Sequence, residues 1–363
     1  FELRQQILDH ITDEITEAEL LGMDAETDDD LRRFYRWDYL MSTRVDSAGN
    51  FPDPRILFIE WEKMRARYGD NFAGERAANW TPVGTDEIPT QGGGMGRINV
   101  VIIDPVDVNT LYVGTAGGGL WRSTDLGGSW TPLTDNIPVL SIADVVVDPS
   151  NNDIIYIATG DSYGYEITWQ PDNDFWGGIY AGGIMKSTDG GSTWLPTGLS
   201  YEQDELMIVQ RMVMHRDDPN ILIAATRNGI YRTTNGGTTW TLESSAHCYD
   251  IALHATDDNM FYAVGDRDVL VSSNGGDTWT VLEDNLSSGD DRMSIETTAD
   301  NPNVIYVLCS DGALKLSTDG GSTWANKDNA DGDVSGFNGY WGLAMGVSQQ
   351  DKDLVFVGGV DMA

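Results

Sequence analysis

One eight-residue phrase occurs five times along this chain and constrains its fold more than any other feature. The phrase is Ser/Thr-x-Asp/Asn-x-Gly-x-x-Trp, and its copies are Ser123–Trp130, Ser187–Trp194, Thr233–Trp240, Ser272–Trp279 and Ser317–Trp324. The tryptophans, at positions 130, 194, 240, 279 and 324, are 64, 46, 39 and 45 residues apart. A period of about 40–45 residues is typical of a propeller blade with four antiparallel strands. We therefore expect an all-β chain built from repeated blades.

Each copy of the phrase is expected to form the turn between the third and fourth strands of its blade. Its Asp or Asn side chain can accept hydrogen bonds from backbone N–H groups of the turn, and its glycines can adopt positive φ angles. The Trp then begins the outer strand and packs its ring beside the neighbouring turn. Because the phrase recurs in every repeat, we predict a structural role rather than a catalytic one for Asp125, Trp130, Asp189, Trp194, Asn235, Trp240, Asn274, Trp279, Asp319 and Trp324.

Alternating apolar runs mark the second strand of each blade, beginning near residues 111, 154, 221, 261, 304 and 354. About six blades are therefore visible, five of them complete, and we expect seven or eight four-stranded blades in the full protein. We assign residues 78–363 to the propeller and expect it to be truncated at its C-terminal end. Residues 1–77 are predicted to form a short α-helical segment, with helices over 1–23, 30–42 and 55–67.

The repeated turn resembles the Asp-box of the BNR repeat, which occurs in sialidases, sortilin-type receptors and xyloglucanase-type glycosidases. All of these proteins are β-propellers, and the resemblance spans roughly residues 78–363. A narrower resemblance is carried by Phe34-Tyr-Arg-Trp37, Gly49–Pro54 and Gly339–Ser348. These segments look like parts of large secreted BNR-propeller proteins exported by the type IX secretion system. The resemblance implies an exported protein, located outside the cell or on its surface.

The negative charge of the chain limits the classes of partner that it can bind. With 58 acidic and 22 basic residues, its formal net charge is −36. Such a surface repels nucleic acids and anionic lipids. The sequence contains no run of 18 apolar residues, the length that a membrane-spanning helix would need. We therefore expect neither a nucleic-acid partner nor membrane insertion. Cys248 and Cys309 lie in apolar strand contexts, where either a disulfide between them or two buried thiols would fit.

In propellers, ligands usually bind on the face opposite the Asp-box turns, where loops enter the inner strands and join second to third strands. An aromatic-rich insertion after residue 159 accounts for the 64-residue step between tryptophans. Its rings could stack on sugar rings or pack against one another. The aromatic candidates for ligand binding are Tyr163, Tyr165, Trp169, Phe175, Trp176 and Tyr180, with Tyr340 and Trp341 from a later loop.

Three arginines, Arg97, Arg211 and Arg292, are expected at the starts of inner strands, where equivalent positions converge on the axis. Sialidases clamp a carboxylate with three arginines, and guanidinium groups suit that task. However, Arg97 is followed by Ile98 and Asn99 rather than by the Ile-Pro of the sialidase signature. The alternative is that the three arginines neutralise carboxylates in the central channel.

Hydrolysis of a glycosidic bond needs two carboxylates roughly 5–10 Å apart. Asp161, Asp266 and Asp311 follow their second strands and are the candidate catalytic residues. No HExxH, CxxC or phosphate-binding glycine loop is present, so we expect no metal site and no cofactor. Calcium in the acidic loop 328–333 is an alternative.

These observations favour a secreted or cell-surface propeller that binds glycans or surface proteins as an adhesion module. Two alternatives stay open. One is a glycoside hydrolase of the xyloglucanase or sialidase type, and the other is a structural subunit of a larger surface assembly.

Overall fold

The computed structural model describes residues 63–64, 66–67, 97–137, 139–161, 182–201, 208–283, 286, 292–327 and 343–358. The chain divides into two compact units, Phe1–Gly69 and Asp70–Ala363. In the first unit, Lys63, Met64, Ala66 and Arg67 are helical and fall within the helix predicted over 55–67. The helices predicted over 1–23 and 30–42, and the predicted boundary between residues 77 and 78, lie outside the described residues.

The described part of the second unit contains six antiparallel sheets, in which strands consecutive in sequence pair with each other. Five sheets have four strands. They are β1 (Ile98–Ile103), β2 (Leu111–Thr115), β3 (Leu120–Ser123) and β4 (Thr131–Pro132); β5 (Ile142–Val147), β6 (Ile155–Thr159), β7 (Ile184–Ser187) and β8 (Leu195–Pro196); β9 (Val209–Met214), β10 (Leu222–Thr226), β11 (Gly229–Thr233) and β12 (Thr241–Ser244); β13 (Asp250–Leu253), β14 (Phe261–Gly265), β15 (Asp268–Ser272) and β16 (Thr280–Glu283); and β17 (Met293–Thr297), β18 (Ile305–Cys309), β19 (Leu314–Ser317) and β20 (Ala325–Asn326). The sixth sheet pairs β21 (Ala344–Val347) with β22 (Val355–Gly358).

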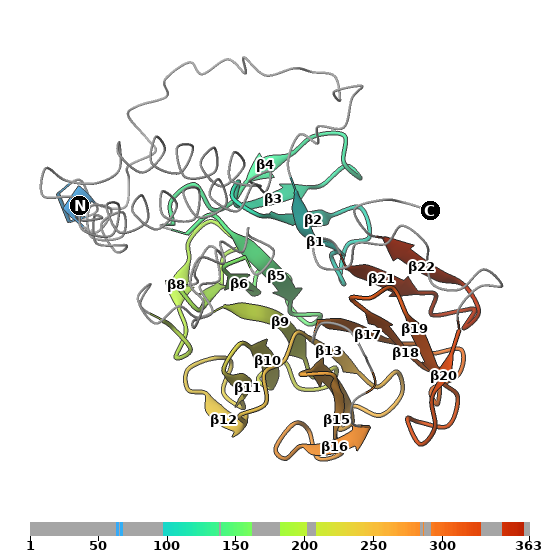
Figure 1. The fold of residues 1–363 in the computed structure, drawn as a ribbon. Coiled ribbons are helices and arrows are strands. Elements are labelled where there is room, and N and C mark those ends of the chain that lie inside the picture. The colour runs from blue at the N-terminus through green and yellow to red at the C-terminus, as the bar shows by residue number, and fades with distance from the viewer. Residues whose placement is uncertain are drawn as a thin grey trace, which may run out of the picture. The chain divides into compact units, whose positions relative to one another are not determined.

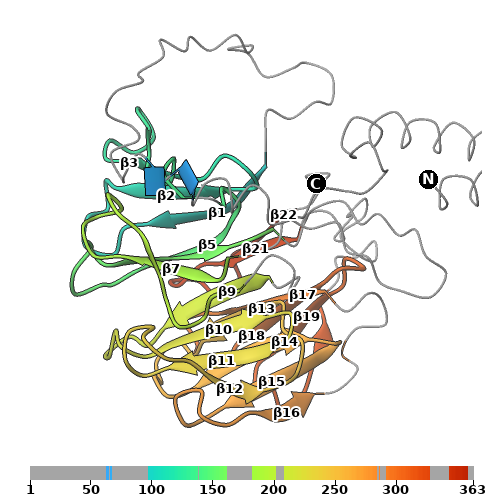
Figure 2. The same ribbon diagram turned by 90° about the vertical axis from the view of Figure 1, so that its left-hand side faces the viewer.

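The six sheets are blades arranged around a common centre (Figure 1). The first strand of each blade is innermost, and it contacts the first strand of the next blade, from β1 through β5, β9, β13 and β17 to β21. In the side view of Figure 2, β1, β5, β9 and β13 follow one another from top to bottom. This arrangement confirms the predicted all-β propeller.

The Asp-box turns join the third and fourth strands through a compact set of hydrogen bonds. In the first turn, Asp125 Oδ1 accepts hydrogen bonds from Ser123 Oγ at 2.7 Å and from the backbone N–H of Ser129 at 2.8 Å. The bonds from the Ser123 and Ser129 hydroxyls lower the pKa of Asp125 to about 2. Asn235 makes the same kind of turn, because its Oδ1 accepts from the Thr239 backbone while its Nδ2 donates to the Thr239 hydroxyl.

The first Asp-box turn contains a strained residue that the others avoid. Leu126 has a φ of 56°, whereas the other four turns place glycine there, at 68° for Gly190, 62° for Gly236, 71° for Gly275 and 72° for Gly320. Leu126 is also exposed, so its side chain contributes little packing. A residue with a Cβ is disfavoured in this left-handed region, and glycine is not.

We expect Leu126→Gly to raise the free energy of unfolding by about 0.5–1 kcal/mol, because relief of backbone strain outweighs the added freedom of the unfolded chain. The matched reverse change, Gly190→Ala, should lower the free energy of unfolding by about 1 kcal/mol. The nearest atom to an added Cβ is 3.4 Å away, so the loss comes from the positive φ of the backbone and not from a steric clash. Urea denaturation measures both. Equal stability of the two variants and the parent would contradict this account.

The hydrophobic core is divided among the interfaces between adjacent blades. One cluster joins Tyr112 and Leu120 of the first blade to Val145, Val147 and the Asp-box Trp194 of the second. The indole N–H of Trp194 also donates to the Leu133 carbonyl, on the neighbouring blade, at 2.9 Å. Four further clusters follow the same plan between each later pair of blades. Each blade therefore uses one face to cover its predecessor and the other to receive its successor.

A second repeated turn, joining the first and second strands, was not recognised in the sequence. In each blade, the residue that follows the first strand accepts hydrogen bonds through its side chain from backbone N–H groups two or three residues later. Six side chains of four residue types do this: Asp104, Asp148, His215, His254, Thr298 and Ser348. Carboxylate, imidazole and hydroxyl acceptors thus serve the same turn.

Both cysteines are buried thiols, and neither forms a disulfide. Cys248 lies in the cluster between the third and fourth blades and Cys309 in the cluster between the fourth and fifth. Of the two alternatives left by the sequence, the structure shows thiols rather than a disulfide.

Candidate functional site

Two cavities lie beside the innermost strands of the propeller. The larger has a volume of about 490 Å³ and the smaller about 130 Å³. Arg211 of β9 and Glu296 of β17 line both cavities, so these two side chains separate them. The centre of the propeller therefore contains charged groups between two hollow regions.

The central polar residues occupy the same register position in four successive blades. Asp144, Arg211, Asp250 and Ser294 face the fourth residue of their own second strands, which are Ala158, Ala225, Val264 and Leu308. Each also lies four residues before the side chain that closes the turn described above. The first and sixth blades have Val100 and Ala344 at this position. A consistent register thus brings polar side chains from separate repeats to the axis.

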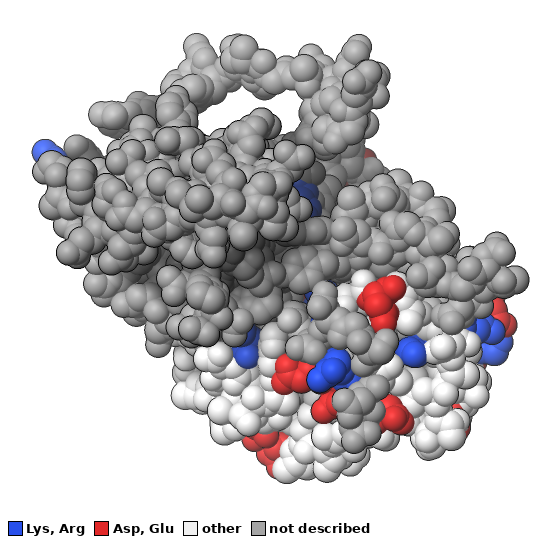
Figure 3. All heavy atoms as spheres, in the orientation of Figure 1, with Lys and Arg blue, Asp and Glu red and all other residues white. Residues whose placement is uncertain are grey.

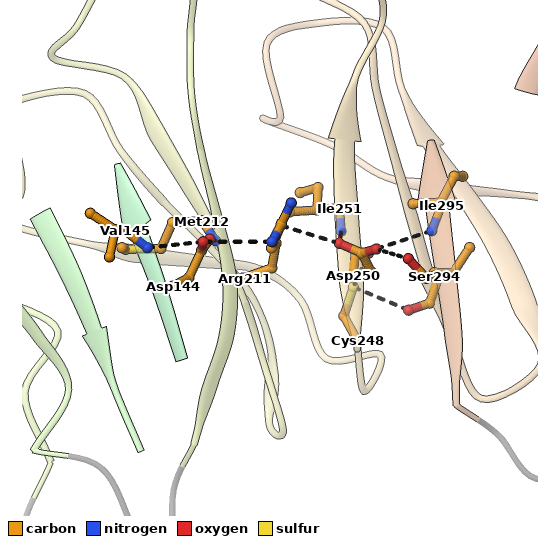
Figure 4. A network of polar contacts seen from close by, with 10 residues as sticks. Asp144, Val145, Arg211, Met212, Cys248, Asp250, Ile251, Ser294 and Ile295 are labelled. Atoms are coloured by element: carbon orange, nitrogen blue, oxygen red, sulfur yellow. Dashed lines mark hydrogen bonds and ion pairs between the residues drawn. The ribbon is translucent and has the colours of Figure 1, made fainter. Parts of the chain in front are cut away.

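Arg211 bridges two carboxylates at this centre (Figure 4). Its guanidinium nitrogens lie 3.6 Å from Asp144 Oδ1 and 3.5 Å from Asp250 Oδ1. Asp144 also accepts hydrogen bonds from the backbone N–H groups of Met212 at 2.6 Å and Val145 at 2.9 Å. The side chains of Asp144 and Asp250 are only 4% and 14% exposed, whereas that of Arg211 is 39% exposed.

Asp250 extends the network to the fifth blade. Its Oδ2 accepts hydrogen bonds from the Ser294 hydroxyl at 2.7 Å and from the Ile295 backbone N–H at 3.0 Å, and its Oδ1 accepts from the Ile251 backbone N–H at 2.9 Å. The network therefore ties together β5, β9, β13 and β17 (Figure 4).

Burial raises the pKa of two acids at the centre. Burial raises the pKa of Asp144, against the opposing charge of Arg211. Burial, together with the negative charge of Asp250, raises the pKa of Glu296 to about 7, and Arg211 opposes this change. Glu296 is therefore a carboxyl group that changes charge near neutral pH inside a cavity, a property often found at functional sites.

The three predicted arginines do not occupy equivalent positions. Arg211 lies within β9, while Arg97 and Arg292 immediately precede β1 and β17. Arg97 forms an ion pair with Asp161, whose side chain is 3% exposed, and its Nε donates to Asn99 Oδ1 at 3.2 Å. This register differs from the expectation that all three arginines begin their strands at equivalent positions, yet Arg211 and Arg292 both line the smaller of the two cavities.

The three predicted catalytic carboxylates follow their second strands but differ in environment. Asp161 is buried after β6. Asp266 is in the β14–β15 turn with a φ of 50°, and its Oδ1 lies 3.5 Å from His247 Nδ1. Asp311, in the β18–β19 turn, accepts a hydrogen bond from the Ala313 backbone at 3.0 Å. Asp161 is thus the one carboxylate of the three that is buried beside a cation.

The aromatic candidates Tyr163, Tyr165, Trp169, Phe175, Trp176, Tyr180, Tyr340 and Trp341 lie outside the described residues, as does the acidic loop 328–333. Among the residues that are described, no group of three or more His, Cys, Asp or Glu side chains could hold a metal ion. The described helical residues include no segment long and apolar enough to cross a membrane. On the face shown in Figure 3, acidic and basic side chains lie close to one another.

The chain shares sequence with curated glycosidases over part of its length. A xyloglucanase from Hypocrea jecorina is 31% identical over 166 residues, which are 42% of this chain and 18% of that protein. A xyloglucanase from Paenibacillus sp. is 29% identical over 165 residues, covering 42% of this chain and 15% of that protein. The matched segment thus spans less than a fifth of each relative. No protein-family profile matches the chain.

Solved structures support the fold. The GH74 enzyme of Niastella koreensis superposes with a TM-score of 0.53 at 20% identity, covering 73% of this chain and 41% of that one. An ancestral GH74 enzyme superposes with a TM-score of 0.50 at 19% identity, covering 68% and 33% of the two chains. Together with the sequence matches, these superpositions confirm the resemblance that the repeated turn predicted.

Proposed function

We propose that this chain, a β-propeller of the BNR or Asp-box type, forms part of a glycoside hydrolase that acts on xyloglucan or a closely related polysaccharide. The observation that carries the proposal is the sequence identity to xyloglucanases from separate organisms, at 29–31% over about 165 residues. The comparisons favour this alternative over the binding and adhesion role that the sequence alone favoured. The role of structural subunit stays a prediction.

The face that holds Asp161 is the candidate active face. It carries the ends of the second strands and the starts of the first strands, on the side opposite the Asp-box turns. There the guanidinium of Arg97 counterbalances the charge of buried Asp161. An ionised, positioned carboxylate can serve as a general base toward water at a glycosidic bond. Asp161 is therefore our first choice for this role.

A polysaccharide substrate also bears on location. A polymer of this kind does not enter a cell, so an enzyme that cleaves it must work outside. The proposed function therefore agrees with the predicted extracellular or cell-surface location and with a glycan as the partner.

The test compares Asp161→Asn with Asp153→Asn in the complete gene product. Asp153 belongs to the same blade but precedes β6, near the Asp-box turn. With xyloglucan as substrate and release of reducing ends as readout, we expect kcat/KM to fall at least about 100-fold for Asp161→Asn and to stay within about twofold for Asp153→Asn. Thermal unfolding of both variants verifies that they fold.

Three results would contradict the hydrolase. The parent protein could retain xyloglucan on a column without releasing reducing ends, which would favour the binding module. It could neither bind nor cleave the polymer. Finally, a folded Asp161→Asn variant with full turnover would remove Asp161 from the mechanism.

A further inference from the structure

Glu296 differs from the other acids at the centre of the propeller in its lack of a partner. Asp144 and Asp250 each accept hydrogen bonds from two backbone N–H groups, and both lie beside the guanidinium of Arg211. No hydrogen bond or ion pair from the residues that the structure describes reaches the carboxyl group of Glu296. A carboxyl group that is withdrawn from water without a partner costs free energy. A ligand that donates hydrogen bonds to Glu296 would reduce this cost.

The larger cavity extends from Glu296 toward the Asp-box side of the propeller. Besides residues of the inner strands, it is lined by residues of the turns that follow them, among them Pro149 and Arg216. These turns lie beside the Asp-box turns, because the backbone N–H of Gly190 donates to the carbonyl of Asp153. The cavity therefore lies on the side opposite the candidate active face, and a ligand there would be independent of the proposed hydrolysis.

The size and the walls of the larger cavity suit a small organic ligand. Its volume of about 490 Å³ falls within the usual range for small-molecule sites, about 300–1,000 Å³. Aliphatic residues of several inner strands line it, among them Ile102, Val147, Leu253 and Ile295. An apolar stem could pack against these residues while a polar group at its end reaches Glu296.

The charges around the larger cavity favour a cation. Of the two arginines that line it, Arg211 lies 3.5–3.6 Å from two aspartates, and Arg216 pairs with Asp258. His215 also lines the cavity, but its Nδ1 accepts hydrogen bonds from the backbone and therefore carries no proton. Glu296 adds a further acid to these pairs, so negative charge is in excess when Glu296 is ionised.

We propose that the larger cavity binds a primary alkylammonium group, such as that of a lysine side chain or of a free alkylamine. The three N–H donors of the ammonium group would reach the carboxylate of Glu296 and backbone carbonyls of the inner strands. Each inner strand pairs with one strand of its own sheet, so its other edge faces the centre (Figure 1). A calcium or magnesium ion would need several oxygen ligands at once. An ammonium group needs fewer, and its stem suits the aliphatic walls.

Calorimetric titration at pH 8 tests the proposal, because the carboxyl group of Glu296 and a primary amine are both charged at this pH. The complete gene product is titrated with n-pentylamine, with Nα-acetyl-lysine methylamide and with 1-pentanol, which has the stem of n-pentylamine but no charge. We expect at least one of the two ammonium compounds to bind with a dissociation constant of about 1 mM or lower. Binding of 1-pentanol should be at least about tenfold weaker. The tighter of the two ammonium compounds shows whether the site prefers a peptide side chain or a free amine.

Glu296→Gln removes the charge and should weaken the binding of the ammonium compounds at least about tenfold. The matched control is Glu283→Gln on β16, which lines neither cavity and should leave the affinity of the parent unchanged. Thermal unfolding shows that both variants fold, and the comparison with 1-pentanol needs the parent alone. The proposal would be overturned if the parent bound neither ammonium compound or bound 1-pentanol equally well. Unchanged affinity in a folded Glu296→Gln variant would overturn it as well.

Discussion

Replacing Arg211 with methionine is expected to lower the free energy of unfolding by about 2–4 kcal/mol at pH 7. The substitution leaves the buried carboxylates of Asp144 and Asp250 without the guanidinium that lies 3.5–3.6 Å from both. Removing one partner of a buried ion pair is strongly destabilising, because an uncompensated charge remains. We place the loss below the top of the usual range, because Arg211 is partly exposed and both carboxylates also accept backbone hydrogen bonds.

The matched control is Arg216→Met, which breaks a more exposed ion pair between Arg216 of the same blade and Asp258 of the next. Exposed pairs contribute about 0–1 kcal/mol, so this variant should lose no more than that in urea denaturation. Adding Asp144→Asn and Asp250→Asn to Arg211→Met should recover part of the stability, because it removes the unbalanced charges. Similar losses for the two arginine variants would contradict a central role for Arg211.

Glu296 is expected to make the protein less stable as the pH rises from about 4.5 to about 7. Its pKa is raised from 4.5 to about 7 by burial and by Asp250. The folded protein therefore binds a proton that the unfolded chain releases. This contribution to the free energy of unfolding is complete below pH 4.5 and lost as the pH passes 7. At 1.36 kcal/mol per pH unit, the upper limit is about 3 kcal/mol, and we expect about 2–3 kcal/mol for this half-buried side chain.

Glu296→Gln should remove this dependence and make the protein more stable than the parent above pH 7. Urea denaturation from pH 4.5 to 8 measures both effects. Glu283→Gln, on the outermost strand β16, is the matched control for the chemical change. If the curves of the parent and Glu296→Gln run parallel across this range, Glu296 does not bind the proton, and the cavity is more hydrated than its packing suggests.

The repeated phrase was sufficient to predict the propeller because its role is local. The turn requires a side-chain acceptor, residues with positive φ angles and a large ring, and Asp or Asn, Gly and Trp meet these requirements at fixed spacing. Ser123–Trp130 and its copies can therefore be recognised in a single sequence. The six second strands were located within a residue of their observed starts because their apolar runs are visible in the sequence, and four of them, β6, β10, β14 and β18, are buried at every position.

The polar centre could not be predicted because its repeat is one of position and not of residue type. Asp144, Arg211, Asp250 and Ser294 share a register but differ in chemistry, and the axis alone brings them together. Arg211 was identified, but it was grouped with Arg97 and Arg292, which precede their strands. The turn-closing residues from Asp104 to Ser348 recur at one position after each first strand, and this recurrence would have aligned the inner strands. It was not recognised because the residue type changes among Asp, His, Thr and Ser.

Because the hydrophobic core lies between blades, the segment that is duplicated in the gene is not the segment that forms a core. The first is a single blade, and the second is the interface between two blades. Gene duplication copies one sheet together with its Asp-box turn. A single blade on its own, however, would expose both of its apolar faces to water and could not form a core. Gain or loss of a whole blade keeps the same type of interface between the blades on either side. The number of blades can therefore change during evolution without a new kind of packing. For the same reason, thermal disruption begun at one junction should spread to its neighbours.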